Sequence, residues 1–317
     1  MIGKKRIGDT ELLVSPVNFG GNVFGWTLDE EESRAILDAY TGHGFNFIDT
    51  ADTYSWWVDG HQGGESEAII GKWMKDRGNR SDIVIATKVG SETRDHPNDI
   101  SAARILKSAE ESLKRLRTDY IDLYYTHFDD KITPVEETLS AYETLIKDGK
   151  VRYIAASNLS PERLVKSLEL AEKSGLPRYQ ALQPHYNLVE RKKFEEIYAP
   201  VVDKYKLSVF PYWSLAAGFL TGKYRTEADL DKSPRGASVR QYLNEKGLNV
   251  LKALDHVARK HQSNQATVSL AWLLAQPLVT APIVSATSKR QLETIVAAPA
   301  LRLDKEDLEI LDKASKS

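Results

Sequence analysis

Four side chains of complementary chemistry lie near the ends of predicted strands: Asp49, Tyr54, Lys88 and His127. A carbonyl that accepts a hydride develops negative charge on its oxygen, so it needs a proton and neighbouring hydrogen-bond donors. A tyrosine supplies that proton more readily if a neighbouring ammonium lowers its pKa from about 10, and a buried carboxylate keeps the ammonium charged and in place. A histidine could donate to the oxyanion or relay the proton. The four residue types together predict reduction of an aldehyde or ketone.

Each of the four residues also has an ordinary structural explanation. An aspartate at a strand end often caps the next turn, a lysine there commonly points to solvent, and a histidine can be a satisfied core residue. Tyr54 is one of 14 tyrosines. The catalytic interpretation is favoured because Asp49, Lys88 and His127 end three successive predicted strands, so that a single mouth would collect them.

The elements that must position these residues alternate between short apolar strands and amphipathic helices. Residues 83–86 are wholly apolar, as expected of a parallel strand buried on both faces. Residues 29–42 and 101–116 carry apolar side chains at helical spacing. Eight such strands predict an α/β fold, a closed (β/α)8 TIM barrel that forms one domain over residues 1–317. The predicted strands are 17–20, 45–49, 83–88, 121–127, 151–157, 181–184, 208–212 and 279–284.

An open, doubly wound sheet is the structural alternative, and the first strand argues against it. The loop at 20–25 reads GGNVFG, which lacks the G-x-G-x-x-G pattern of that fold. Residues 218–224, GFLTGKY, resemble a P-loop but are one residue short and end in tyrosine. Two connections are long, at 89–100 and 221–241, and we expect them to be lids or substrate walls on the rim of the barrel.

Composition excludes several classes of partner. The 43 basic and 45 acidic residues give a net charge of −2, so nucleic acid is not expected to bind. The absence of cysteine excludes disulfides and thiolate chemistry and suits the reducing cytoplasm, where we place the protein. We expect no signal peptide, no membrane span and no metal, because neither the basic N-terminus nor any later run is apolar enough and the first strand lacks paired histidines. The charge is compatible with a monomer or an assembly.

Longer motifs around the four residues resemble those of the aldo-keto reductases. Residues 44–54, GFNFIDTADTY, are similar to a signature that spaces the catalytic Asp and Tyr five apart. The lysine strand IATKV (85–89), the histidine strand YIDLYYTH (120–127) and the strands GKVRYIAASN (149–158) and QPHYNL (183–188) follow in the family's order. The resemblance is to bacterial NAD(P)H-dependent members related to potassium-channel beta subunits. It implies Tyr54 as general acid/base, tuned by Lys88 and Asp49, with His127 orienting the carbonyl of a small-molecule substrate.

The resemblance also implies a nicotinamide cofactor, NADPH, with NADH as the alternative. Residues 212–223 would wrap the pyrophosphate, and residues 283–295 resemble the segment that binds the adenosine 2′-phosphate. This chain has Thr287 where family members often carry Arg, and Thr294-Ile295 in place of Glu-Asn. The resemblance implies that Ser157, Asn158 and Gln183 bind the carboxamide of the nicotinamide and that Tyr212 stacks on its ring. The full set of expected cofactor-binding residues is Gly20, Ser157, Asn158, Gln183, Tyr212, Ser214, Leu215, Gly218, Lys223, Ser285, Thr287, Ser288, Lys289 and Gln291.

Three loop tryptophans, Trp26, Trp56 and Trp57, are the expected substrate contacts, with core packing as the alternative. Sugar-like, aliphatic and aromatic carbonyls all remain open. Two other functions are possible for such a chain. A cofactor-binding regulatory subunit with little turnover is suggested by the channel subunits, although no channel-inactivating N-terminal extension is expected. A class I aldolase would use Lys88 as a Schiff base, but the Asp-Tyr-His set gives it no support.

Overall fold

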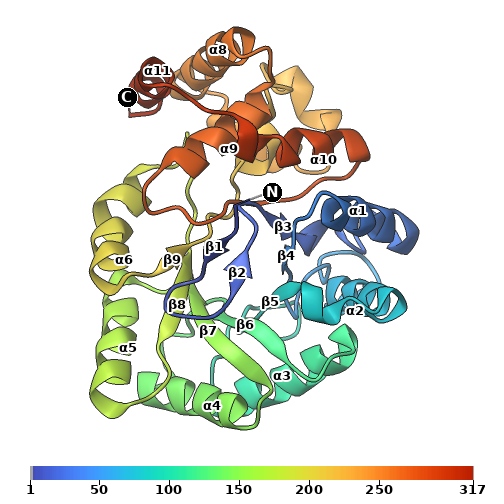
Figure 1. The fold of residues 1–317 in the computed structure, drawn as a ribbon, viewed down its shortest axis with the longest axis vertical. Helices are drawn as coiled ribbons and strands as arrows, with labels where there is room; N and C mark the ends of the chain where they lie inside the picture. Colours follow the sequence, from blue (N-terminus) through green and yellow to red (C-terminus); the bar gives the residue numbers. More distant parts are fainter. Residues whose placement is uncertain (1–2, 317) are drawn as a thin grey trace.

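The computed structural model describes residues 3–316, and its centre is a barrel of eight parallel strands (Figure 1). The strands follow the order β10-β3-β4-β5-β6-β7-β8-β9. The two ends of this order meet, because Thr280 N donates to Val209 O over 2.9 Å and Ile283 N donates to Pro211 O over 2.8 Å. The predicted (β/α)8 barrel is confirmed. The strands are β3 Asn18–Gly20, β4 Phe47–Asp49, β5 Val84–Val89, β6 Ile121–Thr126, β7 Val151–Ser157, β8 Tyr179–Gln183, β9 Ser208–Val209 and β10 Ile283–Val284.

The last two strands are much shorter than their apolar runs predict. Residues 208–212 and 279–284 were both expected to be strands, yet each forms only a two-residue one. Pro211 and Pro282 explain the difference, because proline has no N–H to donate to a neighbouring strand. The chain nevertheless keeps its course along the barrel wall, since Tyr212 N still donates to Pro184 O over 2.9 Å.

A ring of helices surrounds the barrel (Figure 1). Polar caps begin several of them: Asp29 forms a capping box with Glu32 at the start of α1, and Ser160 accepts a hydrogen bond from Arg163 N at the start of α5. The helices that alternate with strands are α1 Glu30–Gly42, α2 Glu65–Arg77, α3 Ala102–Leu116, α4 Val135–Lys147, α5 Pro161–Ser174, α6 Ala199–Tyr205, α9 Gln265–Ala275 and α10 Lys289–Val296. None of the helices in residues 3–316 is long and apolar enough to cross a membrane.

Between β9 and β10 the chain makes a long excursion. The expected loop at 221–241 folds into short turns of helix, which are η4 Ala216–Thr221, η5 Glu227–Lys232, α7 Gly236–Val239 and η6 Arg240–Tyr242. Then α8 Glu245–Lys260 packs beside α11 Lys305–Lys316, and Lys260 Nζ bonds to Asp307 over 2.8 Å. This pair lies outside the ring, at the top of Figure 1.

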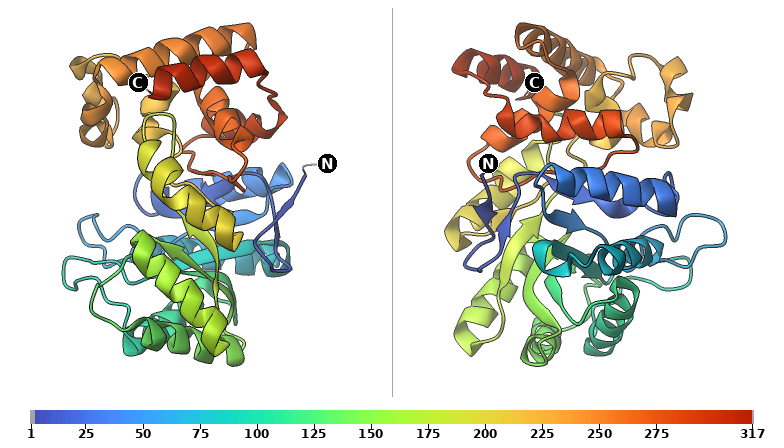
Figure 2. Two further views of the ribbon diagram at one scale, coloured as in Figure 1. Left: turned by 90° about the vertical axis from the view of Figure 1, so that its left-hand side faces the viewer. Right: turned by 45° about the vertical axis from the view of Figure 1, so that its right-hand side comes forward.

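An N-terminal hairpin, β1 Lys5–Arg6 with β2 Leu13–Val14, closes one end of the barrel. Its buried residues Ile7, Leu12 and Val14 belong to the same cluster as the inward-facing side chains Phe47 and Leu123. The left view of Figure 2 shows this hairpin on one side of the molecule and the loops that follow the strands' carboxyl ends on the other. The hairpin was not predicted, and it leaves the opposite end as the only open mouth in the described part of the chain.

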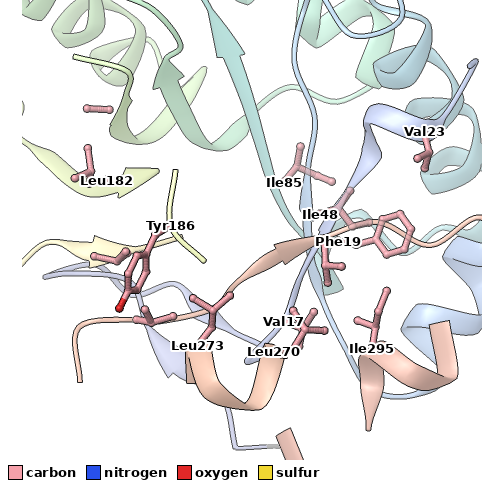
Figure 3. Close-up of a cluster of buried hydrophobic side chains, with 14 of the residues drawn as sticks. Val17, Phe19, Val23, Ile48, Ile85, Leu182, Tyr186, Leu270, Leu273 and Ile295 are labelled. Carbon is pink, nitrogen blue, oxygen red and sulfur yellow. The ribbon is translucent and has the colours of Figure 1, made fainter. Parts of the chain in front are cut away.

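The outward-facing side chains of the strands form a second apolar layer under the helices. Figure 3 shows Phe19 and Ile48 of neighbouring strands close together, with Leu270 and Leu273 of α9 on the helical side. All four are buried. With a packed layer on each face, the strands cannot rotate, so the inward or outward direction of every side chain is fixed by its position along the strand.

Candidate active site

In each of six successive strands, the inward-facing side chains end with a polar residue. Side chains alternate in direction along a strand, so a residue two positions after a barrel-interior residue also points inward. The interior residues Phe47, Ala86, Tyr125, Ala155, Ala181 and Phe210 are each followed, two positions later, by Asp49, Lys88, His127, Ser157, Gln183 and Tyr212. The period of two that builds the core therefore also aims these six polar groups into the mouth.

Lys88 is the centre of the hydrogen-bond network at the floor of the mouth. Its Nζ donates to Tyr54 Oη over 2.8 Å, to Thr50 O over 2.7 Å and to Asp49 Oδ1. Asp49 Oδ2 accepts from Gln183 Nε2 over 2.9 Å. Lys88 and Asp49 are fully buried, while Tyr54 is only partly so. A buried ion pair whose hydrogen bonds are largely satisfied thus supports a phenol that faces open space.

The pKa of Tyr54 is shifted opposite to the direction that the sequence predicts. Burial, and then the negative charge of Asp49, raise the pKa of the Tyr54 phenol well above its ordinary value. Burial also raises the pKa of Asp49 and lowers that of Lys88, and each partner opposes the shift of the other. Tyr54 therefore keeps its proton near neutral pH, as an acid must. The Lys88 N–H bond to Oη is in place to stabilise the phenolate once that proton leaves.

His127, the residue after β6, faces Tyr54 with 6.2 Å between the two ring centroids. Burial, and then the charge of Lys88, lower the pKa of His127 well below its ordinary value. The imidazole is therefore neutral at physiological pH and carries a single N–H. Its Nδ1 is buried without a hydrogen-bond partner among the described residues. His127 can donate one hydrogen bond to a carbonyl oxygen without bringing a positive charge to it.

A cavity of about 840 Å³ opens above these residues, and Asp49, Tyr54 and His127 lie in its wall. Lys88 lies behind the wall, in contact with Tyr54. Most of the residues expected to bind a cofactor line the same cavity. They are Gly20, Ser157, Asn158, Gln183, Tyr212, Ser214, Leu215, Gly218, Lys223, Ser285, Thr287 and Gln291.

Side-chain hydrogen bonds join the polar residues on the far side of the mouth. Asn158 Nδ2 donates to His127 O and to Ser157 Oγ, both over 3.0 Å, and Tyr212 Oη donates to Asn158 Oδ1 over 3.1 Å. Ser157 Oγ donates to Gln183 O over 3.0 Å. Asn158 has φ of 48°, a left-handed conformation that asparagine tolerates better than most residues. The expected carboxamide contacts and the Tyr212 ring are thus held in one arrangement.

The backbone after Tyr212 is irregular where it borders the cavity. Ala217 and Gly218 have φ of 55° and 97° and break η4 into two parts. On the opposite wall, a Cβ at Gly20 would lie 2.8 Å from Ser285 Oγ, so a larger residue there would require the Ser285 side chain to move. Two expected residues do not line the cavity: Ser288 caps α10 by accepting from Gln291 N, and the exposed Lys289 is the first residue of that helix.

The tryptophans expected to contact substrate occupy three different environments. Trp57 lines the cavity, 37% exposed, with its ring 6.2 Å from that of Tyr54. Trp26 packs edge-on against Trp57 with 5.6 Å between centroids, so it supports the wall from behind. Trp56 is not part of the lining. Trp213, which the sequence did not single out for substrate, lines the cavity and is 38% exposed.

Arg235 is a cavity residue that sequence reasoning missed. It comes from the long loop expected to be a lid or substrate wall, and its guanidinium carbon lies 5.2 Å from the Trp26 ring centroid. Its Nη2 is buried and has no hydrogen-bond partner within residues 3–316. The only available signal was an arginine within that loop. An unpaired buried guanidinium fits an anionic ligand. Within residues 3–316, no group of three or more His, Cys, Asp or Glu side chains could hold a metal ion.

Comparison with known proteins shows which family this chain resembles. The model of the aldo/keto reductase family matches residues 16–316. An uncharacterized oxidoreductase, YrpG of Bacillus subtilis, is 37% identical over 96% of this chain and 94% of its own. A probable voltage-gated potassium channel subunit beta of Oryza sativa is 33% identical over 91% of this chain and 88% of its own. Protein tas of Escherichia coli is 30% identical over 96% and 94%.

Proposed function

The chain belongs to the aldo/keto reductase family, and on that premise we propose that it reduces an aldehyde or ketone to an alcohol, reversibly, with Tyr54 as the general acid. Membership implies carbonyl reduction with NADPH or NADH in general. The observation that supports the assignment of Tyr54 is the triple contact of Lys88 Nζ with Tyr54 Oη, Asp49 Oδ1 and Thr50 O at the floor of the cavity.

The chain's own residues account for the proton and the charge. When bound, the reduced nicotinamide supplies the hydride that forms the new C–H bond. The Tyr54 phenol gives its proton to the carbonyl oxygen, and the O–H bond of the alcohol forms as that of the phenol breaks. Lys88 Nζ, already bonded to Oη, stabilises the resulting phenolate. Asp49 holds Lys88 in place, and neutral His127 donates to the carbonyl oxygen, which orients it.

The residues around the cavity fit a nicotinamide dinucleotide. Amide and hydroxyl side chains gather at Ser157, Asn158 and Gln183, where a carboxamide would find both donors and acceptors. Lys223 lines the cavity and Arg235 brings a buried, unpaired nitrogen into it, so two cations are available to a pyrophosphate or a 2′-phosphate. We propose NADPH as the preferred cofactor, with NADH as the alternative.

The substrate that we propose is a small carbonyl compound that enters past Trp57 and Trp213. Both rings are partly exposed in the cavity and present apolar surface to it. The cysteine-free composition suits the cytoplasm, and we propose that compartment.

A panel of sugar-like, aliphatic and aromatic aldehydes and ketones, each mixed with NADPH or NADH, tests the proposed reaction. Oxidation of the cofactor should depend on the carbonyl compound, on the enzyme and on Tyr54. Absence of turnover across all three classes, in a protein that still binds the cofactor, would contradict it.

A second function, a cofactor-binding regulatory subunit, is favoured by one specific observation. The relatives include probable potassium channel beta subunits of Oryza sativa and Arabidopsis thaliana, each 33% identical to this chain. This alternative predicts tight cofactor binding with negligible turnover. The complete Asp49-Tyr54-Lys88-His127 arrangement supports the reductase, so the turnover measurement separates the two functions.

A further inference from the structure

The turn that carries Asp49 and Tyr54 is organised around Lys88. Lys88 Nζ donates to Thr50 O over 2.7 Å, and Lys88 O accepts from Asp52 N over 3.2 Å. Both the side chain and the backbone of Lys88 therefore hold the same six-residue turn. A shift in the position of Asp52 would therefore also shift this turn relative to Lys88.

The side chain of Asp52 is buried, and the reductase mechanism above makes no use of it. It is 8% exposed; one oxygen, Oδ2, lies 3.5 Å from Arg104 Nη2 of α3, and the other, Oδ1, has no hydrogen-bond partner among the described residues. A buried carboxyl with an unsatisfied oxygen is costly to maintain.

A second buried acid lies in the same layer between the barrel and the helices. Glu67 of α2 is fully buried, accepts from Arg115 Nε over 2.7 Å and from Thr87 Oγ1 over 2.5 Å. The charged and titratable groups that act on Asp52 or respond to it come from five elements. They are Glu67 of α2, Arg104 and Arg115 of α3, Lys88 of β5, Tyr124 of β6 and Tyr142 of α4. Two carboxyl groups thus face two arginines, directly behind the strand that carries Lys88.

The charge of Asp52 changes near neutral pH. Burial, and then the negative charge of Glu67, raise the pKa of Asp52 to about 7, whereas Arg104, Arg115 and Lys88 act to lower it. The ionised form of Asp52 in turn favours the charged form of Lys88 and raises its pKa. Lys88 also touches Tyr54, so a single residue lies between Asp52 and the phenol.

We propose that Asp52 is a positioning residue for this site, which anchors the catalytic turn to α3 through Arg104 and supports the ammonium of Lys88 with its charge. The inference rests on the proposed function, because it assigns a role in the same reaction. Asp52 is not one of the residues that line the cavity. Its effect passes through Lys88.

Substitution of Asp52 should change the pH dependence of turnover rather than substrate binding. In Asp52→Asn, Lys88 loses a supporting negative charge, so it gives up its proton at lower pH and the alkaline limb of kcat moves down. The expected movement is about one pH unit, or about tenfold in kcat on that limb. KM for the carbonyl and the affinity for NADPH should stay near wild type. Asp52→Glu, which keeps the charge, should restore much of the limb.

A matched control is Asp122→Asn, because Asp122 is equally an acid buried beside arginines. It is 2% exposed and pairs with Arg80 and Arg152, but at the start of β6, away from the mouth. This variant should lose stability and keep the wild-type pH profile. An unshifted profile in Asp52→Asn, or an equal shift in Asp122→Asn, would overturn the proposal. Wild-type protein that turns over no carbonyl would instead contradict the proposed function.

A measurement without turnover keeps the inference testable if Asp52→Asn does not fold. Protein labelled with 13C at the aspartate carboxyl carbon is titrated by NMR from pH 5 to 9, and the Asp52 resonance is identified by its absence in Asp52→Glu. The resonance should move with a midpoint near pH 7. A resonance that stays at the position of the protonated carboxyl up to pH 9 would overturn the proposal whether or not a substrate has been found, because Asp52 would then bring no charge to Lys88.

Discussion

Lys88 Nζ lies 2.8 Å from Tyr54 Oη, although 34 residues separate them in the sequence. The barrel brings them together because β4 and β5 are parallel neighbours, in register at Asp49 and Ala86. Asp49 ends one strand, Lys88 lies two residues beyond Ala86 on the other, and the turn after Asp49 returns Tyr54 over both. The contact is thus a direct consequence of strand register and of the six-residue turn from Asp49 to Tyr54.

Removal of the amine should destabilise the protein as well as inactivate it. Lys88→Met leaves the Asp49 carboxylate fully buried without its counter-charge, and we expect the free energy of unfolding to fall by about 3–5 kcal/mol. Urea unfolding measures this free energy. Adding Asp49→Asn to Lys88→Met should recover part of the loss, since the buried charge is then gone. Equal stabilities of wild type and Lys88→Met would show that the pair is not buried as described.

Arg235 should contribute to cofactor affinity. Its unpaired guanidinium nitrogen in the cavity predicts that Arg235→Met raises KM for NADPH by roughly tenfold or more, with kcat little changed, because a charge-assisted hydrogen bond is lost. Arg240→Met is the control, since Arg240 is exposed on the same long segment and is not part of the cavity lining. Equal effects of the two substitutions would exclude a specific contact.

Trp57 should determine how well bulky substrates bind. Its ring lines the cavity beside Tyr54, so Trp57→Ala should raise KM for an aromatic aldehyde by about fivefold to tenfold and affect a two-carbon aldehyde less. The adjacent Trp56 provides the control, because it lies outside the cavity lining. If Trp56→Ala and Trp57→Ala changed the two KM values alike, the assignment of the wall would be wrong.

Stability should fall in mild acid because of His185. Burial, and then the charge of Lys193, lower the pKa of His185 to about 4. The unfolded chain takes up this proton near pH 6.5 and the folded chain only near pH 4, so stability present above pH 6.5 is lost as the pH falls through that window, by up to about 3 kcal/mol. Urea unfolding between pH 7 and 4 should show a smaller loss in His185→Gln. The exposed His43→Gln should behave as wild type.

The barrel and the position of the site were predictable from the sequence because both depend on the local pattern of apolar and polar residues. Apolar runs predicted the strands, and polar residues at the ends of successive strands predicted the mouth. The β1–β2 hairpin was missed because each strand has two residues, too few for a periodic signal. Arg235 was missed because its approach to the cavity depends on how a long irregular segment folds back.

The direction of the Tyr54 pKa shift was also beyond the sequence. Sequence identifies which charges are available, here Lys88 and Asp49, but not how deeply each group is buried. In the structure burial and Asp49 raise the pKa of Tyr54. Likewise, the sequence predicted the same role for Trp26, Trp56 and Trp57, whereas of these three only Trp57 lines the cavity.

The most direct test compares wild type with Tyr54→Phe, a change that removes one oxygen and keeps the ring. Turnover is followed by cofactor oxidation with a carbonyl that the wild type reduces, and binding by NADPH fluorescence. We predict a fall in kcat of about 10²–10⁴-fold with NADPH affinity unchanged. Turnover of Tyr54→Phe at the wild-type rate would contradict the assignment of this phenol as the proton donor.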